Sequence, residues 1–332
     1  MSTVKYPATL RRLRVSSHIR ELTASFHLSH KSFIQPLFVN EKNTARTPLA
    51  GLEGIYAETI DSVLTSIKND IDQGVTKFLL FPVPEKKVSV DFDFSFASRV
   101  VSAIKSEFGE AIWLASDLCL CSYTTHGHCG ILNSDHTRLL NDASVQVLVN
   151  YAEQLALAGV DCIAPSDMMD GRIGAIRSRL NEIHLDHVSI MSYSAKFSSQ
   201  WYGPFRDACH SAPNTHGIKD RKTYQISPFT IEDAISSSLR DEMEGADILM
   251  VKPAGLYTDV IAALKEHTRK PLAAYHVSGE YASIESMVQQ GYMNREAAHL
   301  EVWSALVRSG ASMIISYASR NAKEWIEKKL SY

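Results

Sequence analysis

Three cysteines lie close together in the stretch "SDLCLCSYTTHGHCGIL". Cys119, Cys121 and Cys129 offer soft thiolate ligands, which suit zinc, and the Cys-x-Cys spacing lets two sulfurs turn toward one ion. Three protein ligands leave a fourth coordination position for water or substrate, as in a catalytic zinc site. His126 or His128 could instead complete a closed Cys₃His site with a structural role. The spacing alone leaves both alternatives open.

Two lysines form a second motif, because each follows an apolar, β-branched run: Lys196 in "MSYSAKF" and Lys252 in "LMVKPAG". Burial lowers the pKa of an amine, and a second ammonium nearby lowers it further. Two such charges ~4 Å apart at an effective dielectric of about 20 repel by roughly 4 kcal/mol, or about 3 pKa units. The pair therefore predicts a neutral amine and Schiff-base chemistry on a carbonyl substrate. An ion pair at the edge of the fold is the commoner role for any single lysine.

Several side chains in the second half of the chain are of types that bind carboxylates. Arginine offers a fork of donors that matches a carboxylate, whereas amide and hydroxyl groups give single hydrogen bonds. The candidates are Arg206, Arg221, Gln225, Ser278 and Tyr317. The segment 198–223 is too long for a plain connection between a strand and a helix and is typical of a lid. A lid that carries arginine would combine anion binding with exclusion of water.

The elements that must position these groups alternate between short apolar runs and longer amphipathic segments. Strands are expected at 33–39, 77–81, 112–115, 162–164, 188–193, 248–251, 272–276 and 313–316. Eight strand-and-helix units predict a TIM (β/α)₈ barrel, over residues 31–332, with an extended N-terminal arm over residues 1–30. The alternative is an open doubly wound sheet, which is disfavoured because no Gly-x-Gly-x-x-Gly motif follows the first strand.

The barrel places a demand on the candidate residues, because TIM barrels carry their chemistry at the C-terminal ends of the strands. Asp117 with the cysteines, Lys196, Lys252, Ser278 and Tyr317 all follow expected strands. These groups are therefore expected to meet at one mouth of the barrel.

Composition limits the remaining function classes. The chain has 332 residues, of which 45% are hydrophobic, and a net charge of −3, which gives no general attraction to nucleic acid. No apolar run is long enough to cross a bilayer, and the start lacks the apolar middle of a secretion signal. Five cysteines fit reduced thiols or metal ligands better than a disulfide framework. These features predict a cytoplasmic protein.

The motifs "DLCLCSYTTHGHCGIL", "APSDMMDGR", "MSYSAKF", "YGPFRDA", "DRKTYQ", "LMVKPAG" and "AAYHVSGEYA" together resemble those of the porphobilinogen synthase family, also called δ-aminolevulinic acid dehydratase. The resemblance runs from about residue 11 to the end of the chain. It implies a hydro-lyase of heme and tetrapyrrole biosynthesis that condenses two molecules of 5-aminolevulinate to porphobilinogen with loss of two waters. It also implies a homo-octamer built from arm-exchanging dimers.

The resemblance assigns the covalent and metal roles by matching motif. Lys252 would form a Schiff base with the substrate that becomes the propionate side of the product, and Lys196 with the one that becomes the acetate side. Cys119, Cys121 and Cys129 would bind a catalytic Zn²⁺ that orients and polarises the second substrate.

The remaining site residues are assigned in the same way. Arg206 and Arg221, with Gln225 in support, would hold one substrate carboxylate, and Ser278 and Tyr317 would hold the other. Asp117 would orient groups beside the zinc and assist proton transfer.

Two departures from the family pattern stand out. Many bacterial members carry a glutamate that takes part in an allosteric magnesium site, whereas Ser237 stands at the matching position here. Magnesium activation is therefore not expected. The lid is also a few residues longer than usual through "NTHGI".

Two other functions remain open on the residues alone. A lysine-dependent aldolase would need one Schiff-base lysine and no zinc, and would leave the three cysteines unexplained. A zinc-stabilised barrel used for binding or assembly would need no reactive lysine.

Overall fold

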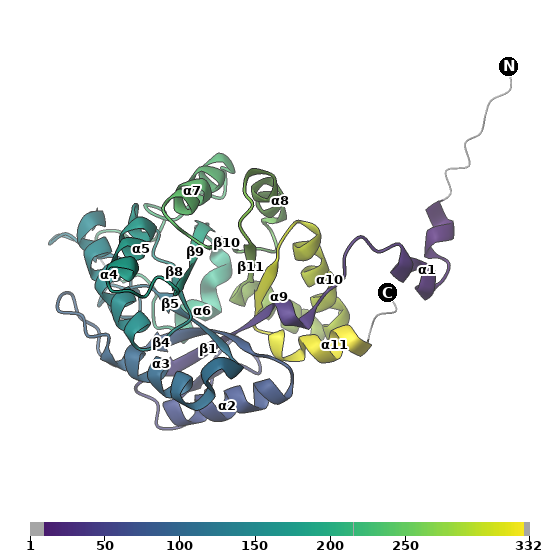
Figure 1. Ribbon diagram of the computed structural model, residues 1–332, viewed down its shortest axis with the longest axis horizontal. Coiled ribbons are helices and arrows are strands. Elements are labelled where there is room, and N and C mark those ends of the chain that lie inside the picture. Colours follow the sequence, from purple (N-terminus) through teal and green to yellow (C-terminus); the bar gives the residue numbers. More distant parts are fainter. Residues whose placement is uncertain (1–9, 215, 329–332) are drawn as a thin grey trace, which may run out of the picture.

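The apolar runs of the sequence form a closed barrel of parallel strands at the centre of the computed structural model, which describes residues 10–214 and 216–328 (Figure 1). The barrel strands are β1 (Phe33–Asn40), β4 (Lys77–Val83), β5 (Trp113–Leu118), β8 (Cys162–Pro165), β9 (Ser189–Lys196), β10 (Ile248–Lys252), β11 (Leu272–His276) and β12 (Met313–Ser316). They pair in chain order, and β12 pairs in parallel with β1, which closes the barrel. The prediction of a TIM barrel is confirmed.

Amphipathic segments between the strands form the outer ring of helices (Figure 1). These helices are α2 (Ile60–Asp72), α3 (Ser95–Phe108), α4 (Asn141–Leu157), α5 (Arg172–Glu182), α7 (Glu232–Met243), α8 (Thr258–His267), α9 (Ser278–Gln289), α10 (Arg295–Arg308) and α11 (Ala322–Lys328). Helix α2 illustrates how the sequence sets them. Thr59 and Ser62 form a reciprocal capping box, and Val63 and Ile67 bury one face against the barrel.

Several strands end later than their apolar runs predicted, and β5 and β9 differ the most. Strand β5 continues to Leu118 and β9 continues to Lys196, beyond the expected ends at 115 and 193. The polar residues at these ends still pair with neighbouring strands, since Asp117 is in register with Ala164. Polarity at the end of a barrel strand therefore marks the mouth of the barrel and not the start of a loop.

Short elements complete the fold. Strands β2 (Thr47–Pro48) and β3 (Tyr56–Glu58) extend the sheet beyond β1, and β6 (Ile131–Leu132) pairs with β7 (Leu139–Leu140). The 3₁₀ helices are η1 (Leu10–Arg14), η2 (His30–Ser32), η3 (Gly109–Ala111), η4 (Gln200–Tyr202) and η5 (Ser319–Asn321). The expected lid contains η4 and α6 (Gly203–Ala208), both of which contact α9.

The N-terminal arm lies outside the barrel as far as it is described. Helix α1 (Ser17–Leu22) stands apart from the ring, on the side of α10 and α11 (Figure 1). Residues 1–9 of the predicted arm lie outside the described residues. Within the described part of the chain, the helices are all too short or too polar to span a bilayer.

Candidate active site

The two lysines occupy the ends of neighbouring strands. Lys196 is the last residue of β9 and Lys252 the last of β10, and the two are in register with each other. Neighbouring parallel strands direct side chains at matched positions to the same face of a sheet. Lys196 is 5% exposed and Lys252 is 3% exposed, so both amines lie inside the mouth of the barrel.

Aromatic rings surround the amine of Lys252. Its Nζ atom lies 4.1 Å from the ring centre of Tyr275, 4.7 Å from that of Phe205 and 5.0 Å from that of Tyr193. Burial among these rings, together with repulsion from Lys196, lowers the pKa of Lys252 to about 7. The amine is therefore close to half neutral at physiological pH, as a nucleophilic lysine requires.

The amine of Lys196 has a different environment. Its Nζ atom donates a hydrogen bond to the backbone carbonyl of Ser166, which follows β8, and lies 5.4 Å from the ring centre of Tyr193. The carbonyl fixes the direction of the Lys196 side chain. Tyr193 contacts both lysines and is therefore the common wall between the two amines.

Asp117 is the acidic group of the site. It lies near the end of β5, where it lines a small cavity. Protein atoms enclose the rest of the side chain, and this burial raises its pKa. The positive charges of Lys196 and Lys252 lower the pKa of Asp117, and a hydrogen bond from the Ser166 side chain lowers it further, but burial has the larger effect. The Oδ1 atom is buried and has no hydrogen-bond partner among the described residues. Asp117 is thus placed to exchange a proton with a molecule bound beside the lysines.

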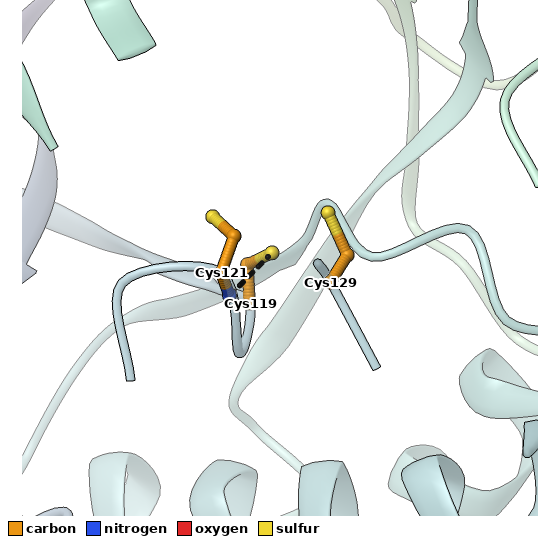
Figure 2. Close-up of side chains that lie close together, drawn as sticks. All are labelled: Cys119, Cys121 and Cys129. Carbon is orange, nitrogen blue, oxygen red and sulfur yellow. Dashed lines mark hydrogen bonds between the residues drawn. The ribbon is translucent and has the colours of Figure 1, made fainter. Parts of the chain in front are cut away.

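The three cysteines lie close together (Figure 2), and two of them line the same cavity as Asp117. The sulfurs of Cys119, Cys121 and Cys129 all lie within 4.8 Å of one another, and all three residues are buried. Cys119 and Cys121 lie in one turn, in which the Cys121 amide donates to the Cys119 sulfur over 3.5 Å. Cys129 lies on a separate loop segment. Hydrogen bonds from the other two thiols hold the pKa of Cys129 well below its usual range. This grouping fits a thiolate-bound metal ion.

The two histidines of the motif do not join the sulfurs. Both ring nitrogens of His128 are engaged, since Nδ1 lies 3.0 Å from the Tyr224 hydroxyl and Nε2 lies 2.9 Å from the Ile218 carbonyl. The Nδ1 atom of His126 accepts from the His128 amide over 3.2 Å. Among the residues that the structure describes, the only metal-competent group is the three-cysteine one. This arrangement favours the open site over Cys₃His.

The two arginines come from the lid and take different positions. Arg221 is buried, and its Nη2 atom donates to the carbonyls of Gly127 (3.0 Å) and Ser211 (2.6 Å). Burial lowers the pKa of Arg221, but the nearby thiols of Cys129 and Cys121 raise it by more, so the guanidinium stays charged. Arg206 is partly buried, and its Nη2 atom donates to the Ser199 carbonyl over 3.1 Å.

The other predicted carboxylate-binding groups are buried. The Ser278 hydroxyl accepts from the Phe205 amide over 3.1 Å, and the Tyr317 hydroxyl lies 3.2 Å from that of Tyr275. The side-chain nitrogen and oxygen of Gln225 are both buried without a hydrogen-bond partner in the described part of the chain. Gln225 lies on the outer side of the site, where it borders a second cavity.

Two cavities adjoin these residues. The inner one is nearly closed and is lined by Asp117, Cys119 and Cys121 together with Phe205 and Cys209. Cys209 and Cys162 are both buried in the hydrophobic core, where they pack against other side chains. The outer cavity measures about 570 Å³, and its charged lining residues are Arg138, Asp170, Lys222, Asp233 and Arg240.

Sequence reasoning missed two features of the site. The aromatic wall of Tyr193 and Tyr275 lies on the two strands that flank Lys252. Behind it, Arg172 forms fully buried ion pairs with Asp167 (3.6 Å) and Asp241 (3.1 Å). A correct strand register would have revealed the tyrosines, but no local signal links residues 172 and 241.

An eight-stranded parallel barrel with buried amines and thiols at the C-terminal ends of its strands defines a TIM-barrel enzyme. A model of the family described as delta-aminolevulinic acid dehydratase matches residues 8–325. The chain belongs to this family and is a hydro-lyase, a porphobilinogen synthase. The family is metal-dependent, and the buried cysteine group is compatible with a metal site.

Relatives of known name agree with this assignment. The chain is 44% identical over 327 residues to delta-aminolevulinic acid dehydratase of Chlamydia pneumoniae, with 96% of each chain covered. It is 38% identical to the enzyme of that name from Synechococcus elongatus, over 95% of this chain and 98% of the relative. A crystal structure of the Toxoplasma gondii enzyme, in complex with its reaction product porphobilinogen, superposes with a TM-score of 0.92 at 35% identity. That match covers 97% of this chain and 92% of the other.

Proposed function

We propose that this enzyme condenses two molecules of 5-aminolevulinate to porphobilinogen, with loss of two waters, through covalent catalysis by Lys252 and Lys196. The observation that carries the proposal is the amine of Lys252, which is buried beside a second amine and has a pKa of about 7. The Toxoplasma relative binds porphobilinogen on the same fold, which supports the same product here.

The first covalent step uses the neutral fraction of Lys252. Its Nζ atom attacks the ketone carbon of the 5-aminolevulinate that becomes the propionate side, and the carbonyl oxygen takes up a proton as the C–N bond forms. That oxygen takes up a second proton and leaves as water; the amine supplies one of the two protons and an acid the other, so the nitrogen is left with a positive charge in the protonated Schiff base. Asp117 is suited to move these protons, since its raised pKa brings it closer to neutral pH.

Lys196 would bind the other substrate molecule in the same way. Its position in register with Lys252 places two substrate-bearing nitrogens on adjacent strands. Two molecules held on neighbouring strands react as an intramolecular pair, which lowers the entropic part of the barrier. Lys196 would carry the molecule that becomes the acetate side of the product.

Cys119, Cys121 and Cys129 would hold a zinc ion, because three thiolates form a soft ligand set and leave one coordination position open. Bound zinc would supply a Lewis acid that polarises and orients the second substrate. Arg221 contributes a positive charge that offsets the charge of the thiolates.

The substrate carboxylates would bind to the groups that surround the amines. Arg206, Arg221 and Gln225 would hold one carboxylate, and the unpartnered amide of Gln225 supports this role. Ser278 and Tyr317 would hold the other, through hydroxyls that are buried at the mouth of the barrel.

A magnesium requirement is not part of the proposal. Ser237 donates to Asp233 over 3.2 Å at the outer cavity, where the Arg240 guanidinium pairs with Asp170 over 2.6 Å. The Arg240 guanidinium therefore already supplies a positive charge near Ser237, the position that matches the magnesium-site glutamate of many bacterial members.

We further propose cytoplasmic localisation and a homo-octamer of arm-exchanging dimers. The described part of the arm exposes Leu13, Val15 and Leu22 by 45%, 75% and 80%, and apolar side chains of this kind are commonly covered by a second subunit.

Borohydride trapping tests the proposed chemistry. The enzyme is incubated with 5-aminolevulinate, reduced, digested and mapped by mass spectrometry, with the variants Lys252→Met and Lys196→Met beside it. Lys265→Met on the exposed face of α8 is the matched control. We expect an adduct on Lys252 in the wild type and the control and no pyrrole formation in either site variant. An adduct confined to other lysines would contradict the proposal.

A further inference from the structure

Glu280 is a buried carboxylate that joins the ends of two barrel strands, and nothing described so far assigns it a role. It lies in the first turn of α9 and is 8% exposed. Its Oε2 atom accepts from the Val277 amide over 2.8 Å, and its Oε1 atom accepts from the Gly255 amide over 2.8 Å. Val277 follows β11, while Gly255 follows β10 three residues after Lys252.

The carboxylate occupies the space that a side chain at position 255 would need, so any larger residue there would displace it. A Cβ atom on Gly255 would lie 2.7 Å from Glu280 Oε1, closer than Cβ atoms come to other atoms. The amides of Leu256 and Ala254 also stabilise the ionised form. Two backbone amides from the ends of different strands therefore donate to one side chain, whereas an ordinary helix cap would use only the Val277 amide.

These contacts close a ring of interactions around the reactive amine. From Lys252 the chain leads to Gly255, and Glu280 connects Gly255 to Val277, which precedes Ser278. The Ser278 hydroxyl accepts from the Phe205 amide, and the Phe205 ring returns to 4.7 Å from the Lys252 amine. The carboxylate thus connects the covalent residue to the residue proposed to hold a substrate carboxylate.

We propose that Glu280 is a positioning residue, whose carboxylate fixes the backbone after Lys252 relative to Ser278 and so sets the position of the amine. This inference rests on the proposed function of Lys252. A displacement of about 1 Å at a reacting group slows a reaction by about 10²-fold.

The ionisation of Glu280 supplies an independent readout. Burial raises the pKa of Glu280 to about 7, against the effect of the backbone amides. The titratable groups that face it are the hydroxyls of Tyr202 and Tyr257, whose pKa values are raised above 10, and His276, whose pKa is lowered to about 3. Around neutral pH, Glu280 is therefore the one member of this group that changes charge. A protonated carboxyl keeps only one good acceptor, so the clamp weakens below pH 7.

The test measures the single-turnover rate of the borohydride-trapped adduct on Lys252 in Glu280→Gln holoenzyme. The glutamine side chain offers only one acceptor oxygen. Its NH₂ group would face the second backbone N–H, and two donors cannot form a hydrogen bond with each other. We expect the rate to fall by about 10²-fold. Gly255→Ala, which displaces the same carboxylate without changing its charge, should give a similar loss. The double variant should be no slower than the slower single one.

Glu285→Gln is the matched control, because Glu285 is a buried glutamate of the same helix that pairs with Arg295 and His299 and not with β10. We expect it to lower thermal stability and leave the trapping rate within twofold of the wild type. Between pH 5 and 6 the wild-type rate should rise by about fiftyfold, because Lys252 loses its proton and Glu280 ionises from a form that is about 10²-fold slower, whereas Glu280→Gln should show about a tenfold rise.

The outcomes separate the two proposals. Trapping at wild-type rates in both Glu280→Gln and Gly255→Ala would overturn the role of Glu280 and leave the function of Lys252 intact. Equal losses in Glu280→Gln and Glu285→Gln would also overturn it, because the effect would then follow helix stability. Absence of a Lys252 adduct in the wild type would overturn the proposed function, and Glu280 would have no reactive amine to position.

Discussion

Replacing Lys252 with methionine should change how the stability of the enzyme depends on pH. In the unfolded chain this amine holds its proton up to its ordinary pKa of 10.5, whereas in the folded protein the pKa is about 7. The unfolded state therefore binds more protons between these two values, and the free energy of unfolding rises with pH across that window. Below pH 7 both states are protonated, so the folded protein carries the full penalty of a buried charge.

The size of the effect follows from the shift. Where only the unfolded state holds the proton, each pH unit adds about 1.4 kcal/mol to the free energy of unfolding. The increase over the first unit above pH 7 is smaller, because the folded-state amine is still half protonated at pH 7. Through this group the free energy of unfolding of the wild type therefore rises by roughly 2 kcal/mol from pH 7 to pH 9. An unfolding entropy of about 2.1 cal/mol/K per residue over 332 residues converts that gain to a thermal shift of about 3 °C. Lys252→Met removes the proton and therefore the gain.

The assay is differential scanning calorimetry of the metal-loaded wild type and variant at pH 7, 8 and 9 at one scan rate. The quantity of interest is the unfolding temperature of the variant minus that of the wild type at each pH. The packing change caused by the substitution is the same at all three pH values, so only the titration of Lys252 changes this difference. We expect Lys252→Met to be more stable relative to the wild type at pH 7 than at pH 9, by about 3 °C. An unfolding temperature of the variant minus that of the wild type that stays constant or rises with pH would refute a depressed amine pKa.

Three further predictions concern the structure around the site. Arg172→Met should lower the free energy of unfolding by about 3–5 kcal/mol in urea titrations, because two buried aspartates lose their ion-pair partner; a loss below about 1 kcal/mol would contradict this. Gly127→Ala should lower metal content and turnover, because its Cβ atom would meet a backbone carbonyl at 2.4 Å. Gly54→Ala, with a similar φ but open space around it, should not. Cys121→Ser should lose bound metal by elemental analysis together with activity, whereas Cys162→Ala in the core should retain both; equal metal content in the two would count against the cysteine site.

The sequence was most informative where one residue type carries a whole chemical role. Lys196 and Lys252 were expected at the ends of apolar strands, where the structure has them, and the three cysteines do group together. Their chemical roles stay predictions. The sequence argument named both burial and repulsion between the lysines as causes of the Lys252 pKa shift but gave a magnitude only for repulsion, whereas burial is the larger cause in the structure. Burial depends on rings from β9, β11 and the lid, and their approach cannot be derived from residue order.

Other features depend on contacts between distant segments. Glu280 reads locally as an acid in the first turn of a helix, and only the fold shows that it also reaches Gly255. His128 reads as a possible metal ligand, but its ring is occupied by Tyr224 and Ile218, about ninety residues away. Local spacing gives the types of group available to a site, while their partners are set by the closure of the barrel.

The attachment of His128 to the lid links two processes that are usually studied separately. Ile218 lies in the expected lid and Tyr224 directly follows it, while His128 directly precedes Cys129, a proposed metal ligand. Opening this part of the lid must either break both hydrogen bonds or pull on the turn that carries a metal ligand. By thermodynamic reciprocity, a molecule that binds more tightly when the lid is shut must then also raise the affinity of the cysteines for a metal, and loss of the metal must lower the affinity for that molecule. Resistance to chelators should accordingly increase when substrate fills the site.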